Sequence, residues 1–303
     1  MAAATITDAP SIWPNGRPPV VVQEKYAKAI EVLKEEARSM LMAEGNTISD
    51  KLVLIDTLER LGVAYHFDQE IEEQLEEIFK FDSGQDYDLF TTALRFRLLR
   101  QHRHYVSCSV FDKFKGDNGK IKETLSDDAK GQLSLFEAAH LRIHGEQFLK
   151  EAVAYTKYHL KRMVQQLECP LQDQVKRALE QPLHRGIPRI EIRYYISIYQ
   201  KDNSKNELLL KLAKLDFNFV QNIHKKELHE LSRPVIREEQ SGRGLSWGTA
   251  YHFEPQYSYA RAAITQSIQM LTVLDDTYDN YATIEEAQLF DEILERRNID
   301  AID

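Results

Sequence analysis

The spacing of apolar residues is the feature that most restricts how this chain folds. From Val21 onward they recur at steps of three and four residues, the spacing of side chains on one face of an α-helix. A clear example is the set Leu52, Ile55, Leu58 and Leu61. No segment of the sequence shows the sustained two-residue alternation of a β-strand. We therefore predict an all-α protein.

Turn-forming residues divide the sequence into helices of roughly ten to twenty residues. Glycine, asparagine and proline mark most of these interruptions, as at Gly45-Asn46 and Cys169-Pro170. The most polar interruption covers residues 200–206 and precedes a new helical pattern, so we place a domain boundary there. The predicted organisation is a flexible, proline-rich segment at 1–20, a helical domain at 21–200 and a second helical domain at 207–303.

The composition narrows the classes of partner. Hydrophobic residues make up 43% of the 303 residues, which is enough for a substantial core. The net charge of -9 repels a phosphate backbone, so we expect no nucleic-acid partner.

The sequence contains no apolar stretch long enough for a signal peptide or membrane span and no transit-peptide pattern, so the expected location is the cytoplasm. Cys108 and Cys169 are expected to be free, buried thiols in a reducing compartment.

The main candidate for chemistry is the acidic run Asp275-Asp276-Thr277-Tyr278-Asp279. Residues four apart on a helix lie about 40° apart around the axis and about 6 Å apart along it, so Asp275 and Asp279 share one face while Asp276 turns away by about 100°. Mg2+ prefers oxygen ligands and is commonly held by one or two carboxylates together with substrate phosphates. The pattern therefore favours a site for magnesium and a diphosphate.

This spacing alone gives weak support, because a similar acidic pattern occurs at Glu72-Glu73-Gln74-Leu75-Glu76. That earlier segment is charge-rich and amphipathic, which is typical of a solvated helix face. The later acids follow a mostly apolar helical segment, so we expect their carboxylates to face the protein interior, where a cation would offset the cost of unpaired charge. The residue pattern by itself leaves a metal site and simple helix-terminal acids as equal alternatives.

Several blocks in a fixed order carry a family resemblance. The blocks at 253–261 and 274–286 read FEPQYSYAR and LDDTYDNYATIEE, and both they and their spacing closely resemble plant sesquiterpene synthases. Upstream landmarks of the same family are PSIW at 10–13, LGVAYHF at 61–67, HGE at 144–146, RYY at 193–195 and LDFN at 215–218. The chain thus resembles the plant terpene synthase family from Pro10 to Asp303.

This resemblance implies a helical amino-terminal domain followed by a class I terpenoid synthase helical domain. It also implies that Asp275 and Asp279 bind Mg2+, with Mn2+ as an alternative ion, and that Asp276 supports substrate binding. The implied substrate is a prenyl diphosphate, most simply farnesyl diphosphate, which such an enzyme ionises to an allylic carbocation that cyclises. Metal ions stabilise charge on the leaving group, and exclusion of water protects the cation.

Three further residues are site candidates by their position relative to family landmarks. Trp247 lies as far before the acidic run as the family's pocket tryptophan, although a core indole is the simpler interpretation because most tryptophans are largely buried. Arg237 and Arg243 are candidates for the family's diphosphate clamp, with solvated loop charges as the alternative. Pro234 and three glycines in this stretch predict an irregular segment rather than a regular helix.

The family's second metal motif has no counterpart before Asp303. We therefore expect the sequence to be a fragment with a truncated catalytic domain and at most small lyase activity. Two alternatives from other functional classes stay open. One is a chain-elongating prenyltransferase, which normally needs two aspartate-rich motifs, and the other is a noncatalytic helical interaction protein derived from a synthase.

Overall fold

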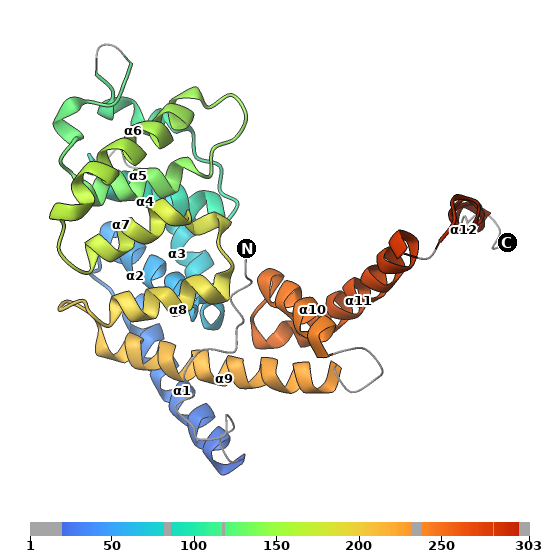
Figure 1. Ribbon diagram of the computed structural model, residues 1–303. Helices are drawn as coiled ribbons and strands as arrows, with labels where there is room; N and C mark the ends of the chain where they lie inside the picture. Colours follow the sequence, from blue (N-terminus) through green and yellow to red (C-terminus); the bar gives the residue numbers. More distant parts are fainter. Residues whose placement is uncertain (1–19, 82–85, 117–118, 232–237, 281, 297–303) are drawn as a thin grey trace. The chain divides into compact units, whose positions relative to one another are not determined.

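The computed structural model describes residues 20–81, 86–116, 119–231, 238–280 and 282–296 (Figure 1). Helices make up nearly all of the regular structure in these ranges. The described residues contain no β-strand, and an isolated antiparallel bridge joins Lys115 to Ile121. The all-α class predicted from the apolar spacing is therefore confirmed.

The chain forms two compact units, of which unit 1 ends at Phe219 and unit 2 begins at Val220. The α-helices that lie wholly in unit 1 are α1 (Val20–Leu41), α2 (Ile48–Arg60), α3 (Asp68–Lys80), α4 (Leu89–Gln101), α5 (Ala129–Ala139), α6 (Gln147–Met163), α7 (Leu171–Glu180) and α8 (Pro188–Tyr199). The short 3-10 helices of this unit are η2 (Ala64–His66), η3 (Cys108–Phe114), η4 (Glu123–Leu125), η5 (Val164–Gln166) and η6 (Leu183–Arg185). Helix α9 (Glu207–Leu231) starts in unit 1 and ends in unit 2, which also contains α10 (Glu238–Tyr251), η7 (Pro255–Tyr257), α11 (Ser258–Asn280) and α12 (Ile284–Arg296).

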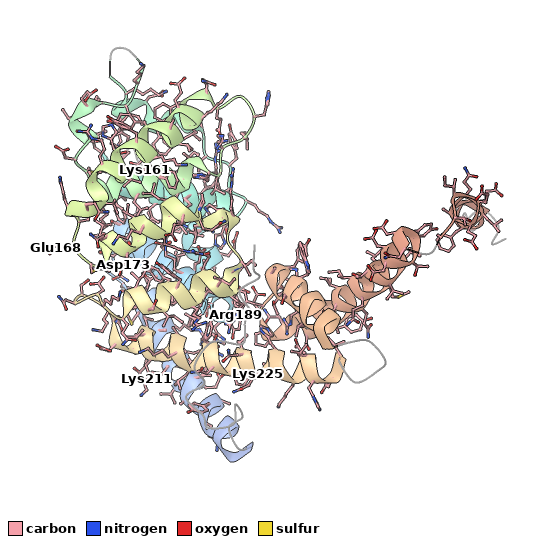
Figure 2. All side chains as sticks on the ribbon, in the orientation of Figure 1. Lys161, Glu168, Asp173, Arg189, Lys211 and Lys225 are labelled. Atoms are coloured by element: carbon pink, nitrogen blue, oxygen red, sulfur yellow. The ribbon has the colours of Figure 1, made fainter. Side chains whose placement is uncertain are left out.

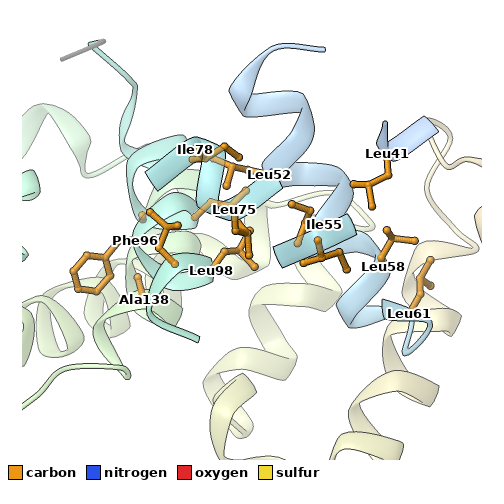
Figure 3. Close-up of a cluster of buried hydrophobic side chains, with 14 of the residues drawn as sticks. Leu41, Leu52, Ile55, Leu58, Leu61, Leu75, Ile78, Phe96, Leu98 and Ala138 are labelled. Atoms are coloured by element: carbon orange, nitrogen blue, oxygen red, sulfur yellow. The ribbon is translucent and has the colours of Figure 1, made fainter. Parts of the chain in front are cut away.

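The predicted apolar face of α2 lies in the core of unit 1 (Figure 3). Leu52, Ile55 and Leu58 are completely buried, and Leu61, just after the helix, is 1% exposed. Side chains from α3, α4 and α5 belong to the same cluster, namely Leu75, Ile78, Phe96, Leu98 and Ala138. Burying one leucine or isoleucine side chain contributes about 1.5–3 kcal/mol relative to leaving it exposed. A cluster of this size therefore dominates the packing energy of unit 1.

Side-chain caps determine where three of these helices begin. Thr47 and Asp50 form a capping box at the start of α2, in which each side chain accepts a hydrogen bond from the backbone N–H of the other residue. Asp88 and Asp128 cap α4 and α5 by accepting backbone N–H groups of the first turn. Such caps pair donors that the helix itself leaves open, and each typically contributes about 1 kcal/mol.

Helix α4 is buried along nearly its whole length, including two of its arginines. Arg97 is 1% exposed and pairs with Asp56 of α2, while Arg60 of α2 pairs with Glu137 of α5. Burial of the Asp56 carboxyl favours its neutral form, but the two arginines outweigh this effect and lower its pKa. The four charges compensate one another, because an uncompensated buried charge would cost several kcal/mol.

The first half of α9 completes unit 1. Leu209 and Leu212 lie in the same core as the leucines of α2. The polar residues 200–206 form the loop between α8 and α9. Unit 1 continues to Phe219 and so extends beyond the domain boundary that we propose from the sequence.

Two polar contacts hold this part of α9 in unit 1. The carboxylate of Asp216, which is 1% exposed, accepts a hydrogen bond of 2.7 Å from the hydroxyl of Tyr65. Arg189, near the start of α8 (Figure 2), donates to the backbone carbonyl of Phe217 at 3.0 Å. Both contacts bury charged groups next to a defined partner, as buried charge requires.

The glycine-rich stretch around Gly244 is helical in α10, so the predicted irregular segment is wrong for this part of the chain. Gly244 and Gly248 face α11: a Cβ on Gly244 would lie 2.9 Å from the Thr265 methyl carbon, and one on Gly248 would lie 3.1 Å from the Arg261 carbonyl oxygen. The missing side chains therefore let the two helices approach closely. Packing between α10 and α11 offsets the poor intrinsic helix propensity of glycine.

Both cysteines are free thiols, but Cys169 is exposed and Cys108 is half-buried, so the prediction that they are buried is wrong. Cys169 lies in the turn before α7, and connecting segments usually run over the surface because buried backbone would lack hydrogen-bond partners. Among the helices of the described residues, none combines the length and the apolar character needed to cross a membrane.

Candidate metal centre

The acidic run lies in the last turns of α11. This helix extends to Asn280, so Asp275 and Asp279 lie on one face of it, as the four-residue spacing predicts. Polar neighbours bind the helix backbone rather than the carboxylates: the Thr277 hydroxyl donates to the Val273 carbonyl at 2.7 Å, and the Asn280 amide donates to the Asp276 carbonyl at 2.9 Å. The side chains of Thr277 and Asn280 therefore do not occupy the carboxylate oxygens, which stay available for a ligand.

The carboxylates of Asp275, Asp276 and Asp279 are exposed, so the expectation that they face a protein interior is wrong for this chain. The buried residues of α11 are Arg261, Thr265 and Gln269, all in its first half. Of the apolar residues that suggested a buried segment, those nearest the acidic run are exposed, with Met270 73% and Leu271 62% exposed, whereas Ile264 and Ile268 are half-buried. An apolar composition shows that a helix face can be buried, whereas burial also needs a partner element.

The donor set on α11 fits magnesium in its chemistry. Asp275 and Asp279 offer oxygen ligands about 6 Å apart along one helix face, and Mg2+ usually takes one or two carboxylates while keeping waters or phosphate oxygens as its other ligands. Within the described ranges, no group of three or more histidine, cysteine, aspartate or glutamate side chains is arranged to hold a metal ion. Two carboxylates therefore need oxygen ligands from water or a diphosphate to complete the coordination shell.

Trp247 lies on α10 and is 57% exposed, so the interpretation of its indole as a core side chain is wrong for this chain. Tyr251, one turn later on the same helix, is 64% exposed. Side chains four residues apart share a helix face, so the indole and the phenol form an aromatic surface on α10. This surface leaves the indole accessible to a ligand.

The two candidate arginines have different standing in the structure. Arg237 lies outside the described residues, as does Pro234. The backbone of Arg243 belongs to α10, but the position of its side chain is also outside the described part. Their interpretation as a diphosphate clamp stays a prediction.

Sequence reasoning missed a buried ion pair in unit 2 between Glu227 of α9 and Arg261 of α11. Arg261 donates to both carboxylate oxygens, from Nε at 2.9 Å and from Nη2 at 2.7 Å. Burial opposes ionisation of Glu227, but hydrogen bonds from Arg261 and Ser258 lower the pKa of its carboxyl. The available signal in the sequence was the four-residue spacing of Arg261, Thr265 and Gln269. This spacing places the arginine on the same helix face as two uncharged polar residues.

Comparisons with known proteins agree with the resemblance seen in the sequence. The family "Terpene synthase, N-terminal domain" matches residues 15–179, and the family "Terpene synthase family, metal binding domain" matches residues 226–303. The chain is 53% identical to gamma-cadinene synthase of Ocimum basilicum, over 97% of this chain and 56% of that protein. It is 54% identical to gamma-curcumene synthase of Pogostemon cablin, over 93% of this chain and 54% of that protein. The chain thus spans about half the length of these curated relatives.

Solved structures show the same fold. One is isoprene synthase from grey poplar leaves in complex with three Mg2+ ions and dimethylallyl-S-thiolodiphosphate, which matches with a TM-score of 0.82 and 36% identity over 91% of this chain and 56% of that one. Another is limonene synthase with 2-fluorolinalyl diphosphate, with a TM-score of 0.82 and 30% identity over 95% of this chain and 57% of that one. The helical fold, the two family matches and the identity to these enzymes together establish that the chain belongs to the terpene synthase family.

Proposed function

We propose that this chain carries the first metal site of a Mg2+-dependent terpene synthase, a lyase that releases diphosphate from a prenyl diphosphate. The carrying observation is the pair of exposed carboxylates of Asp275 and Asp279, one turn apart on α11 and inside the stretch that matches the metal-binding domain. Farnesyl diphosphate is the proposed substrate, because gamma-cadinene synthase and gamma-curcumene synthase are among its relatives.

In this proposal the acids of α11 hold the ion and the substrate together. Asp275 and Asp279 would hold Mg2+, or Mn2+ in its place, and Asp276 would support binding of the diphosphate. Bound Mg2+ stabilises the negative charge that develops on the leaving diphosphate. Because neither carboxylate encloses the ion, we expect the metal and the diphosphate to bind together rather than separately.

Residues of α10 and the segment before it complete the proposed site. Arg237 and Arg243 bind the diphosphate, since guanidinium groups make paired hydrogen bonds to phosphate oxygens. The exposed indole of Trp247 faces the allylic cation, and an aromatic face stabilises a desolvated cation by about 2 kcal/mol. Exclusion of water at this stage directs the cation toward cyclisation rather than capture as an alcohol.

Calorimetry on the 303-residue chain tests the metal site. Titrations use Mg2+ alone, an unreactive farnesyl diphosphate analogue alone, and the analogue in the presence of Mg2+. We expect strong binding only in the third case, and we expect Asp275→Asn and Asp279→Asn each to weaken it by at least about tenfold, the effect typical of disturbing a metal site.

The chain supplies its own control for this experiment. Glu76→Gln removes one negative charge from the other acidic pattern, on α3, where the carboxylate pairs with Lys80 at 2.7 Å. This change should leave analogue binding unaltered. Analogue affinity that stays the same in both aspartate variants would contradict the assignment of the metal site, and a wild-type chain without Mg2+-dependent binding would favour the noncatalytic alternative.

A further inference from the structure

Arg261 is completely buried, and each nitrogen of its guanidinium group donates at least one hydrogen bond. Besides the two bonds to Glu227, its Nη1 donates to the backbone carbonyls of His252 and Glu254, at 3.1 and 2.6 Å. The Glu227 carboxylate accepts one more hydrogen bond, of 2.5 Å, from the Ser258 hydroxyl in the first turn of α11. One side chain of α11 thus connects this helix to α9 and to the segment that follows α10.

Arg261 lies on the buried face of α11. Thr265 and Gln269 follow at four-residue intervals and are the other buried residues of the helix. Gly248 and Gly244 of α10 lie close to Arg261 and Thr265 of α11, Gly248 against the Arg261 backbone and Gly244 against the methyl group and backbone of Thr265. The buried face of α11 is therefore a polar stripe against a glycine surface, which tolerates little rotation of the helix.

The acidic run continues this face farther along the helix. Asp279 lies 18 residues after Arg261, about five complete turns at 3.6 residues per turn, so the two side chains leave the helix in about the same direction. Asp275 deviates from that direction by about 40° and Asp276 by about 60° in the opposite sense. The rotation of α11 about its axis therefore decides where all three carboxylates point.

A small rotation is enough to disturb a magnesium site. A carboxylate about 6 Å from the helix axis moves by about 4 Å when the helix rotates by 40°. Magnesium requires near-ideal octahedral geometry with ligands at about 2.0–2.1 Å. The rotation of α11 must therefore be fixed to well within 40° for Asp275 and Asp279 to share an ion with a diphosphate.

We propose that Arg261 and Glu227 are positioning residues, whose buried pair fixes the rotation of α11 and thereby aims Asp275 and Asp279 at a common metal ion. This inference rests on the proposed function of the two aspartates. The pair itself lies about 21 Å before Asp275 along the helix, so it acts without touching metal or substrate. Its planar guanidinium group suits this role, because paired and geometrically fixed hydrogen bonds define an orientation that a single lysine ammonium cannot.

The first part of the test measures the orientation of α11 without any ligand. Spin labels are attached to Lys225→Cys on α9 and Met270→Cys on α11, both exposed in unit 2, in a chain carrying Cys108→Ser and Cys169→Ser. Pulsed electron paramagnetic resonance spectroscopy then gives the distribution of distances between the two spin labels. We expect a narrow distribution in this background and a broad one after the double change Glu227→Leu with Arg261→Met.

The double variant is chosen because it removes both charges together. Replacing a buried pair by apolar side chains is often neutral for stability, whereas removing one partner leaves an uncompensated charge. Circular dichroism is expected to show unchanged helix content. Arg261→Lys serves as the conservative variant, with an intermediate distribution, since it keeps the charge but loses the bonds to both carboxylate oxygens at once.

The second part measures binding of the farnesyl diphosphate analogue over a range of Mg2+ concentrations. The double variant should need at least about tenfold more Mg2+ for half-saturation, with Arg261→Lys in between, because loss of residues that orient metal ligands typically lowers affinity by 10–100-fold. The matched control is Arg100→Met with Glu146→Leu, which removes a similarly buried arginine–glutamate pair from unit 1. This control should leave both the label distances and the Mg2+ requirement unchanged.

Each outcome decides one part of the inference. A distance distribution that stays narrow in the double variant would show that the pair does not hold α11. A broadened distribution with an unchanged Mg2+ requirement would refute the positioning of the aspartates. If the wild-type chain bound no analogue in the presence of Mg2+, the positioning role would fall together with the proposed function, and the label distances would still show whether the pair holds the helix.

Discussion

His102 lies at the end of α4, and we expect its side chain to make the stability of unit 1 depend on pH. Its Nε2 lies 2.7 Å from a carboxylate oxygen of Glu59, and its Nδ1 lies 3.5 Å from one of Glu72. Asp68 carries a further negative charge near the ring. Burial of the imidazole favours its neutral form, but the hydrogen bond with Glu59 and the charge of Glu72 outweigh burial and raise the pKa of His102 above 6.5.

The sign of the effect follows from linkage. A raised pKa in the folded state means that folded His102 binds its proton more tightly than the unfolded chain does. Its contribution to the free energy of unfolding is complete below the unfolded pKa of about 6.5 and is lost as the pH rises through the folded pKa. The difference in unfolding free energy between the wild-type chain and His102→Asn should therefore shrink between about pH 6 and pH 8 in urea titrations.

His140 provides a control of opposite sign. Burial, together with the nearby Arg185 and Arg142, lowers the pKa of His140. Folding then favours the neutral ring. The contribution of His140 to the free energy of unfolding is therefore present above the unfolded pKa and is lost as the pH falls through the lower folded pKa. His140→Asn should change the pH dependence in the direction opposite to His102→Asn, and the same trend in both variants would contradict this explanation.

At the scale of elements, α10 depends on its neighbour more than on its own sequence. The close approach of α10 to α11 requires a residue without a side chain at Gly248, where even a Cβ would meet Arg261 backbone atoms at 3.1 and 3.3 Å. Gly248→Leu should therefore separate the two helices and destabilise unit 2 by about 1–3 kcal/mol, the usual effect of overpacking. The free energy of unfolding from urea titrations gives this value directly.

An exposed position on the partner helix offers the matched substitution. Ala263→Leu adds a large side chain to α11 on its exposed side. It should change the free energy of unfolding by no more than about 0.5 kcal/mol, as is usual for surface substitutions. A similar loss of stability in both variants would mean that added volume on any face is harmful and would contradict the glycine contact as the cause.

At the scale of the whole molecule, α9 is shared between the two compact units. Residues 15–179, matched by the amino-terminal family, lie within unit 1, and residues 226–303, matched by the metal-binding family, lie within unit 2. The buried residues Leu209, Leu212 and Ala213 of α9 belong to the core of unit 1. The end of a stable amino-terminal fragment therefore lies within α9.

Two fragments test this division. A fragment that ends at Phe219 should unfold cooperatively in urea, because it keeps all described core contacts of unit 1. A fragment that ends at Gln200 should be less stable by several kcal/mol, since removing a single buried leucine side chain costs about 2–5 kcal/mol. Equal unfolding free energies for the two fragments would show that the first half of α9 adds nothing to unit 1.

The local pattern of the sequence already determined the helical class and the core face of α2. Leu52, Ile55 and Leu58 share one face in any α-helix, and apolar side chains on one face are stable when they are buried together. The same reasoning placed Asp275 and Asp279 on one face of a helix. Such conclusions depend only on residue spacing and on 3.6 residues per turn, so no tertiary contact is needed to reach them.

Only the tertiary structure decided which faces found partners. The glycines of α10 predict a poor helix, but packing against α11 stabilises it. The apolar residues of α11 predict burial, but Met270 is exposed. Arg261 would be expected on the surface from its charge, yet Glu227, 34 residues earlier, compensates it inside unit 2. Each of these outcomes depends on contacts between segments that are distant in sequence, and the free energy of such contacts outweighs the local preference of any single residue.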